Sequence, residues 1–317
     1  MLSKLEVFLE TKARFGLTNT VTQYIDLCFA WNWEHDADFV RLLQATCDAR
    51  NLSLLQVTPQ NLEPVLHDLV SGQLNFGGFV DRASDSDDRF NPLVEWANQH
   101  PVKKVNPYWY ARRAWNKVEM DRQFRQAGLL TPVTIVLPPF LNQPAIQPYD
   151  LGCLGEGFAI KPAHGGGGKG VHTGMVCWEQ VNLARQEYSD DHYLLQAHVN
   201  PIQLGAHPAW FRVIYFAGRI FPCWWEPKSH LYTPVSGYDE NHLSLQPLRS
   251  IVSVINRICR LDLFSTEIAL NDQGEFVVID HVNDPIDLRM QSRAVDGLPD
   301  DIAVSIAEGL ADFVTRL

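Results

Sequence analysis

Short apolar runs alternate with helical stretches over the first hundred residues. Residues 22–30 read as a strand, and residues 35–50 carry apolar side chains at helical spacing behind Asp36 and Asp38, which suit a helix start. The same alternation predicts strands at 52–57, 75–80 and 102–106 and helices at 62–70 and 91–100. This order is typical of a parallel sheet with crossover helices, so we expect a small Rossmann-like α/β domain.

The pattern changes beyond Pro107. A helical stretch over residues 110–128 ends at Gly128, a suitable C-cap, and a strand at 131–139 follows and stops at two prolines. A helix is also predicted at 247–262. Further strands are predicted at 157–163, 170–176, 193–199, 210–225 and 275–282. The chain therefore reads as an α/β first third and an α+β remainder, with a boundary near residues 105–110.

Composition excludes several classes of protein. The 317 residues hold 26 Lys and Arg against 37 Asp and Glu, a net charge of −11 that does not suit nucleic acid or an anionic membrane as partner. No apolar run approaches a membrane span, and the charged start MLSKLEVFLETKARFG does not fit a signal peptide, so we expect a cytoplasmic protein. The six cysteines are scattered without a C-x-x-C pair and are interpreted as reduced core thiols.

The most informative stretch is the glycine-rich sequence GFAIKPAHGGGGKGVHTGMV at 157–176. Its glycines formally match G-x-G-x-x-G, but the residues that follow are strand-like rather than helical, so a dinucleotide site is excluded. A Walker loop fails because Ala163 and Gly170 stand where that motif needs Gly and Ser or Thr. The remaining interpretation is a glycine-rich flap between two strands. With Lys161 and Lys169, the backbone N–H groups of Gly165, Gly166, Gly167 and Gly168 suit a polyphosphate; the alternative is a flexible surface hairpin.

Acidic residues within two later apolar segments suggest a metal site. Glu267 lies in FSTEIAL, and Asp280 and Asn283 lie in VVIDHVND, the two being joined by the turn NDQG. A hairpin would bring these oxygen ligands together, which suits Mg²⁺ shared with phosphate. The alternative is that the acids only cap strand ends, although an unpaired charge within an apolar strand is unfavourable.

These motifs, in this order, resemble the ATP-grasp superfamily over residues 107–292. A helix lysine before a G-x-x-x-P segment matches Lys117 and the stretch from Gly128 to Pro132, and a strand K-P before the flap matches Lys161 and Pro162. An adenine hinge resembles LLQAHV, and the strand arginine before a glycine turn resembles Arg212. The nucleotide-binding residues that the resemblance implies are Lys117, Lys161, Gly165, Gly166, Gly167, Gly168, Lys169, Gln196, Ala197, Val199 and Arg212.

The metal ligands implied by the resemblance are Glu267, Asp280 and Asn283. The family places its second acid two residues before the asparagine, whereas here His281 occupies that position and Asp280 stands three before. A β-bulge would restore Asp280 and Asn283 to one face. Asp284 or Asp287 are the other acids that could take over this role, so the second ligand stays open at this point.

The resemblance also implies domains and chemistry. It divides the chain into an N-terminal α/β pre-ATP-grasp domain (1–106), an ATP-grasp subdomain with the flap (107–195) and a second one with the metal site (196–317). It implies ATP and Mg²⁺ as cofactors and an ADP-forming ligase that joins a small-molecule acid or peptide to an amine, with Lys161, Arg212 and Arg289 as catalytic residues. Arg289 is expected to bind a substrate carboxylate. Further candidates on the acceptor side are Arg82, Lys228, His230 and Arg293.

Two other functions stay open from the sequence. The first is an ATP-grasp kinase that phosphorylates a hydroxyl group, although the acidic charge does not favour a highly phosphorylated substrate. The second is a nucleotide-binding module without turnover, which the unusual spacing of Asp280 and Asn283 leaves in play. No nucleic-acid or membrane partner is expected, and a homodimer is the assembly considered.

Overall fold

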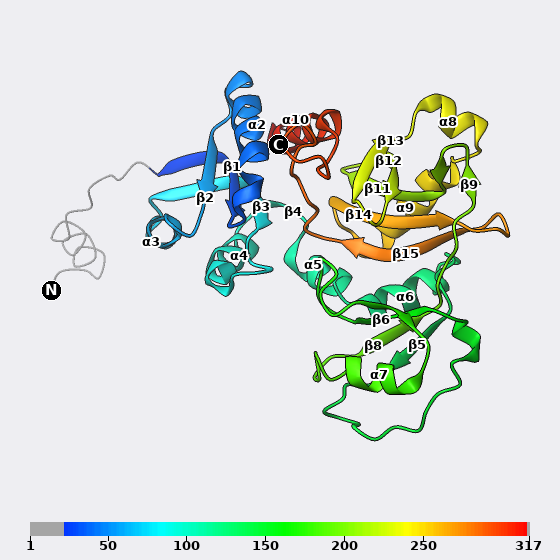
Figure 1. Ribbon diagram of the computed structural model, residues 1–317. Coiled ribbons are helices and arrows are strands. Elements are labelled where there is room, and N and C mark those ends of the chain that lie inside the picture. Colours follow the sequence, from blue (N-terminus) through cyan, green and yellow to red (C-terminus); the bar gives the residue numbers. More distant parts are fainter. Residues whose placement is uncertain (1–21, 316–317) are drawn as a thin grey trace, which may run out of the picture. The chain divides into compact units, whose positions relative to one another are not determined.

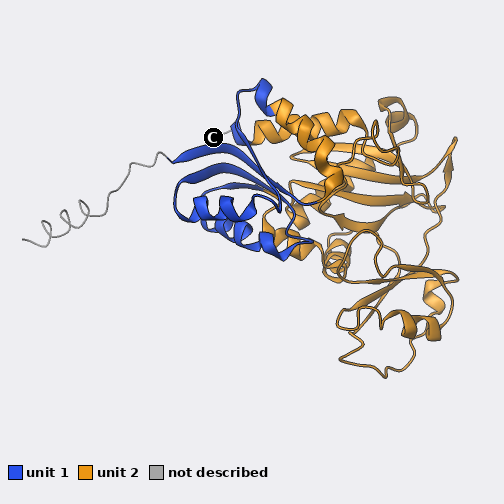
Figure 2. Cartoon of the chain, turned by 60° about the vertical axis from the view of Figure 1, so that its left-hand side comes forward, with its two compact units in different colours: residues 1–32, 47–104, 314–317 blue, residues 33–46, 105–313 orange. Residues whose placement is uncertain are grey.

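A computed structural model of the chain describes residues 22–315 (Figure 1). The charged start, on which the absence of a signal peptide was predicted, lies outside the described residues. Two compact units can be distinguished among the rest, one of residues 22–32, 47–104 and 314–315 and one of residues 33–46 and 105–313 (Figure 2). The predicted division into three domains stays a prediction.

The smaller unit is built on a four-stranded sheet in the order β2-β1-β3-β4. Strand β1 is parallel to both β2 and β3, and its residues Leu27 to Ala30 have no exposed surface, as expected for a parallel strand covered on both faces. The α/β prediction is therefore confirmed. The elements up to residue 105 are β1 (Gln23–Trp31), α2 (Ala37–Ala49), β2 (Leu54–Val57), α3 (Leu62–Val70), β3 (Leu74–Arg82), α4 (Asn91–Gln99) and β4 (Lys103–Val105). Most of α2 belongs to the larger unit.

The larger unit contains a five-stranded antiparallel sheet in the order β13-β12-β11-β14-β15. Its strands are β11 (Trp210–Phe216), β12 (Arg219–Glu226), β13 (Leu231–Pro234), β14 (Leu263–Leu270) and β15 (Phe276–Asn283). One face packs on α6 (Lys117–Gln126) and α9 (Pro247–Cys259), where Phe124 and Val252 join Phe211 and Phe264 in one core. Because side chains alternate along a strand, Arg212, Glu267 and Asp280 project from the opposite face, which we call the polar face, although the buried Ile214 and Phe216 of β11 share it.

A second antiparallel sheet has the order β5-β8-β6-β7. Its strands are β5 (Thr134–Leu137), β6 (Phe158–Pro162), β7 (His172–Met175) and β8 (Tyr193–Gln196). Helix α7 (Trp178–Ala184) buries Val181 against Phe158, Ile160 and Tyr193 of this sheet. The α+β architecture predicted for the later part of the chain is thus confirmed.

Several elements differ from the prediction. The single helix expected at 110–128 is two helices, α5 (Tyr108–Ala114) and α6, because the Asn116 side chain accepts a hydrogen bond from Glu119 N (3.0 Å) and starts a new helix. Gly128 follows α6 with a φ of 81°, as a C-cap glycine should. The elements not predicted include α8 (Gly237–His242), α10 (Asp300–Thr315) and the short strands β9 (Gln203–Leu204) and β10 (His207–Pro208).

Two further expectations concerned the state of the cysteines and the absence of a membrane span. All six cysteines are free, and Cys28, Cys47, Cys223 and Cys259 are buried, but Cys153 is exposed, so the core interpretation is wrong for that residue. Over residues 22–315 no helix has the length and apolar character needed to span a membrane.

Candidate functional site

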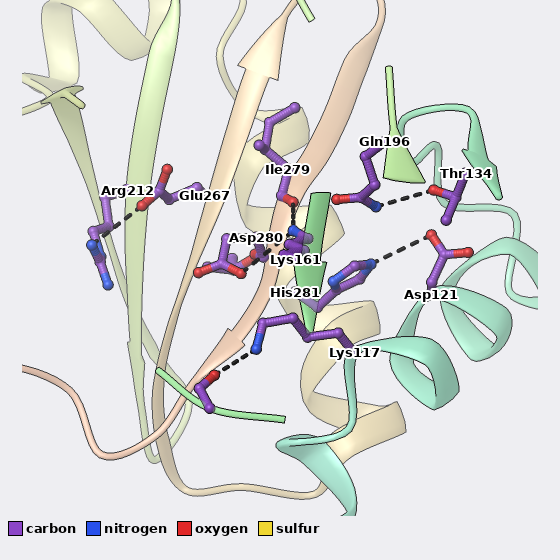
Figure 3. A network of polar contacts seen from close by, with 12 residues as sticks. Lys117, Asp121, Thr134, Lys161, Gln196, Arg212, Glu267, Ile279, Asp280 and His281 are labelled. Carbon is purple, nitrogen blue, oxygen red and sulfur yellow. Dashed lines mark hydrogen bonds and ion pairs between the residues drawn. The ribbon is translucent and has the colours of Figure 1, made fainter. Parts of the chain in front are cut away.

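Charged side chains from three strands gather on the polar face of the five-stranded sheet (Figure 3). Glu267 on β14 is paired in register with Arg212 on β11 and with Asp280 on β15. Residues that are directly opposite in a sheet project from the same face. The predicted arginine and two of the predicted metal ligands therefore form one row across the sheet.

The register of β14 and β15 explains the unusual spacing of Asp280 and Asn283. Asn283 is opposite Ser265 and Asp280 is opposite Glu267, so three steps on β15 match two steps on β14, as a β-bulge requires. Asp280 and Asn283 thus share the polar face. His281 is fully buried, with its Nε2 3.4 Å from Asp121 Oδ1 on α6, and therefore lies on the core face.

The other two candidate ligands have partners of their own. Asp284 accepts hydrogen bonds from Asn106 Nδ2 (2.6 Å) and Trp115 Nε1 (3.3 Å). Asp287 accepts from Arg289 Nη2 at 2.7 Å. The geometry therefore favours Asp280, although its role as a metal ligand stays a prediction.

Two lysines from other elements reach the same row. Lys161 on β6 is buried, donates to the backbone oxygen of Ile279 (3.2 Å) and lies 4.0 Å from Asp280 Oδ1 (Figure 3). Lys117, the first residue of α6, donates to the backbone oxygen of Gly165 (2.5 Å). Burial lowers the pKa of Lys117, and the charge of Asp280 partly opposes this shift. The sheet that carries the flap thus contributes the positive charge of Lys161, and the five-stranded sheet contributes the negative charge of Asp280 beside it.

The two carboxylates have different environments. Burial raises the pKa of Glu267, and the charge of Arg212 only partly offsets this effect. Burial also acts to raise the pKa of Asp280, but the charges of Lys161 and Lys117 outweigh it and lower that pKa to about 2. Asp280 is therefore ionised at neutral pH because cations surround it.

Arg212 is held in place by partners that the sequence did not identify. Its Nε donates to Ser265 Oγ (3.2 Å), its Nη1 donates to Glu267 Oε1 (3.2 Å), and its guanidinium lies 4.8 Å from the ring centre of Trp225. Trp210 Nε1 donates to the other oxygen of Glu267 (3.0 Å). Burial acts to lower the pKa of Arg212, but Tyr232 and the carboxylates of Glu267 and Asp280 raise it. The only sequence signal for these residues was alternation along β11, which places Trp210 and Arg212 on one face.

The glycine flap joins β6 to β7, as predicted. Gly165, Gly167, Gly168 and Gly170 all have positive φ, between 62° and 100°, a conformation that other residues adopt only with strain. Around Gly165, Gly166, Gly167 and Gly168 no atom comes within 4 Å of where a Cβ would stand. Lys169 is exposed. This part of the flap is therefore open to a ligand.

The predicted adenine hinge follows β8. Gln196 is buried and donates from Nε2 to Thr134 Oγ1 (3.0 Å). The backbone N–H of Ala197 donates to the oxygen of Val133 (2.9 Å), so this group is already paired. Val199 lies beyond the strand in an irregular segment. The assignment of all three to adenine stays a prediction.

Arg289 differs from a free anion receptor. Its Nε and Nη2 donate to Asp287 Oδ2 (2.9 and 2.7 Å), its Nη1 and Nη2 donate to the carboxylate of Asp296 (3.2 and 2.9 Å), and it lies 5.7 Å from the Trp33 ring centre. The pKa of Arg289 is raised, first by its hydrogen bonds to Asp287. A substrate carboxylate would have to displace an aspartate to bind in two-point fashion.

Three of the remaining acceptor candidates lie on the surface of the larger unit. Lys228, His230 and Arg293 are exposed, the first two in the turn between β12 and β13. Arg82 belongs to the other compact unit and ends β3. The acceptor role of each stays a prediction.

The donor set can be compared with what Mg²⁺ requires. Two carboxylates and the Asn283 amide oxygen are hard oxygen ligands on one face. Between residues 22 and 315 no group of three or more His, Cys, Asp or Glu side chains is placed to hold a metal ion by itself. The residues therefore fit a Mg²⁺ ion that also takes phosphate oxygens, as the sequence suggested.

Comparison with solved structures identifies the fold. The chain is similar to the ATP-grasp ligase PsnB complexed with minimal precursor, Mg and ADP (12% identity, 92% of this chain and 99% of that chain, TM-score 0.62). It is also similar to an ATP-grasp RimK domain protein from Sphaerobacter thermophilus (18%, 90% and 98%, 0.60) and to D-alanine–D-alanine ligase from Bacillus anthracis (11%, 92% and 96%, 0.63). Protein-family models and curated protein sequences gave no match. The chain therefore has the ATP-grasp fold, which confirms the resemblance at the level of structure.

Proposed function

We propose that the protein is an ATP-dependent ligase that joins a carboxylate to an amine through an acyl-phosphate intermediate and releases ADP. The observation that supports this most is the row of Arg212, Glu267 and Asp280 beneath Lys161, next to an open glycine flap. Cations that can bind phosphate thus lie within a few ångströms of oxygen ligands that can bind a metal ion. The similar solved structures are titled ligases, which agrees with the proposal.

In this proposal the triphosphate of ATP lies between the flap and the acidic row. The open backbone of the flap would bind phosphate oxygens through N–H groups, and Lys117 and Lys161 would neutralise their charge. Glu267, Asp280 and Asn283 would hold Mg²⁺, which supplies charge neutralisation at the β- and γ-phosphates.

The chain's own residues then favour phosphoryl transfer by position and charge. Phosphoryl transfer gives a protein little covalent work, so fixed cations supply most of the acceleration. Arg212 is suited to this role because Ser265, Glu267 and Trp225 fix its guanidinium before substrate arrives. The flap would exclude water, which would otherwise hydrolyse the acyl phosphate before the amine attacks.

The experiment that tests the proposal follows ADP release with pooled carboxylic acids and amines. Hydroxylamine is added in place of the amine, because it converts an acyl phosphate to a hydroxamate and does not react in this way with a phosphate ester. ADP formation with a hydroxamate and, with the amine, an amide product supports the ligase. A product that gains a phosphate replaces the ligase by a hydroxyl kinase. ATP binding without ADP release for any acceptor indicates a module without turnover.

The substrates we propose are small molecules or peptides with a carboxylate and an amine. One similar structure is titled as PsnB complexed with the precursor peptide PsnA2, and another as D-cycloserine synthetase, so proteins of this fold include both kinds. The net charge of −11 agrees with the absence of a nucleic-acid substrate. We place the reaction in the cytoplasm, where ATP is available.

A further inference from the structure

Both ends of the glycine flap contact one short segment, residues 187–191, which follows α7 and which we call the anchor segment. The flap itself spans residues 163–171, between β6 and β7. The residue types of the anchor segment give no functional signal in the sequence. Its contacts with the flap come from the side chains of Glu187, Tyr188 and Asp191.

The first end of the flap is held by Asp191. One carboxylate oxygen of Asp191 accepts from the backbone N–H of His164 (2.7 Å), and the other lies 3.0 Å from His164 Nδ1. Asp191 is 14% exposed. Burial acts to raise its pKa, but the hydrogen bonds from His164 outweigh this effect and lower it. Asp191 is therefore an ionised acceptor that fixes both the backbone and the side chain at the start of the flap.

The second end of the flap is held by Tyr188 and Glu187. A Cβ on Gly170 would lie 2.6 Å from Tyr188 Cε2 and 3.1 Å from Pro162 Cγ, so the Gly170 backbone passes directly against the tyrosine ring. Two residues on, His172 Nε2 lies 3.0 Å from Glu187 Oε2. The end of the flap is thus packed on Tyr188, and the first residue of β7, directly after the flap, is paired with Glu187.

The anchor segment is itself tied to the sheet. The hydroxyl of Tyr193, a fully buried residue of β8, accepts from the backbone N–H of Tyr188 (3.1 Å). Asp191 N donates to the oxygen of Tyr188 (3.0 Å), and Ala163 N donates to the oxygen of His192 (2.8 Å). A segment fixed in this way can transmit the rigidity of β8 to the flap.

We propose that the anchor segment is a positioning element that holds both ends of the glycine flap and so presets the flap for phosphate binding. Consecutive glycines lose much backbone entropy when they are ordered. Fixing the ends of the loop in advance reduces the entropy still to be lost when a ligand binds. The claim that the flap is preset for phosphate rests on the proposed function. The claim that the anchor segment orders the flap is independent of it.

The first test measures amide hydrogen exchange over residues 163–171 without nucleotide. Asp191→Asn and Glu187→Gln should each raise exchange in the flap by about tenfold, because local opening becomes more favourable when an end contact is lost. Glu240→Gln is the matched control: Glu240 is also 14% exposed and pairs with Arg249 on α9. It should leave the flap unchanged. Flap exchange that is the same in both anchor variants as in the native protein overturns the proposal.

A glycine pair tests the contact with Tyr188. Gly170→Ala and Gly168→Ala both place a side chain at positive φ (69° and 74°), but only at residue 170 does the new Cβ meet another residue. Gly170→Ala should therefore raise exchange at His172 more than Gly168→Ala does. Tyr188→Ala should remove most of that difference when combined with Gly170→Ala. Equal effects of the two glycine variants contradict the anchor contact.

The last test measures binding of a non-hydrolysable ATP analogue with Mg²⁺ by calorimetry. If the proposed function holds, Asp191→Asn should weaken binding by about tenfold, and the KM for ATP should rise with little change in kcat. Glu187→Gln, whose ion pair is half-exposed, provides the same measurement should Asp191→Asn not fold. If the native protein binds no nucleotide, the proposed function is refuted. The hydrogen-exchange experiment then still tests whether the anchor segment orders the flap. Anchor variants that bind like the native protein overturn the positioning role.

Discussion

Replacing Lys161 with Met removes a buried positive charge while the aliphatic part of the side chain is kept. The ammonium group is the one cation within 4.0 Å of Asp280 among the ion pairs of the described residues, and only 9% of the side chain is exposed. At that distance, with an effective dielectric constant of about 20, the two charges attract by about 4 kcal/mol before desolvation is counted. The variant should therefore affect both stability and nucleotide binding.

The effect on stability follows from the pKa of Asp280. That pKa is lowered from 3.8 to about 2, and the shift corresponds to about 2 kcal/mol. A lowered carboxyl pKa stabilises the fold above the unfolded-state value near 4, and the contribution is lost as pH falls toward 2. Lys161 supplies the largest favourable part, so Lys161→Met should lower the free energy of unfolding by about 1–2 kcal/mol at pH 7. The difference from the native protein should shrink below pH 4.

The effect on ATP is larger because the lysine would face the phosphates. Loss of a desolvated charge contact weakens binding by about 2–5 kcal/mol, or at least about 30-fold in Kd. Calorimetric titration with a non-hydrolysable ATP analogue and Mg²⁺ measures this. Arg122→Gln, which removes an exposed cation from α6, is the control and should bind normally. If Lys161→Met binds the analogue within twofold of the native protein, the phosphate role of Lys161 is wrong.

Three further predictions concern the metal ligands, Arg289 and the packing around Gly297. Glu267→Gln and Asp280→Asn should each abolish ADP formation while far-UV circular dichroism stays native, since each removes a negative ligand oxygen; an active Asp280→Asn would show that another acid holds the metal. Arg289→Lys should raise the KM of the acceptor by about 10–100-fold without changing ATP affinity, because a lysine cannot keep the paired geometry; an equal effect on ATP would place Arg289 with the phosphates. Gly297→Ala should lower the free energy of unfolding by about 1–3 kcal/mol in urea, because its Cβ would lie 2.5 Å from a backbone oxygen. Gly237→Ala, with open space around it, is the control, and equal stability of the two would refute the clash.

The sequence alone predicted most of the strands and helices, and it supplied the residues of the candidate site. Apolar periodicity located the strands and the main helices because burial of a face imposes that spacing. The glycine flap could be predicted because few residues other than glycine adopt its positive φ values, and the order of motifs was sufficient to predict the ATP-grasp fold. Features that depend on strong local constraints can therefore be predicted from the sequence itself.

The break between α5 and α6 was not predicted, because the local pattern of residues gives little sign of it. Residues 110–128 keep a helical pattern throughout, and only the cap at Asn116 separates the two helices. Helix α10 was also missed, although the sequence carries its signal: Ile302, Ile306 and Leu310 repeat every four residues and are buried.

The details of the site were decided by tertiary structure. The bulge in β15 depends on pairing with β14, so the sequence could not choose between Asp280 and His281. The aspartate partners of Arg289 and the contacts between the flap and residues 187–191 join positions whose meeting depends on loops and packing. A residue's type shows which bonds it is able to form, but its partner is set by the backbone that brings the two together.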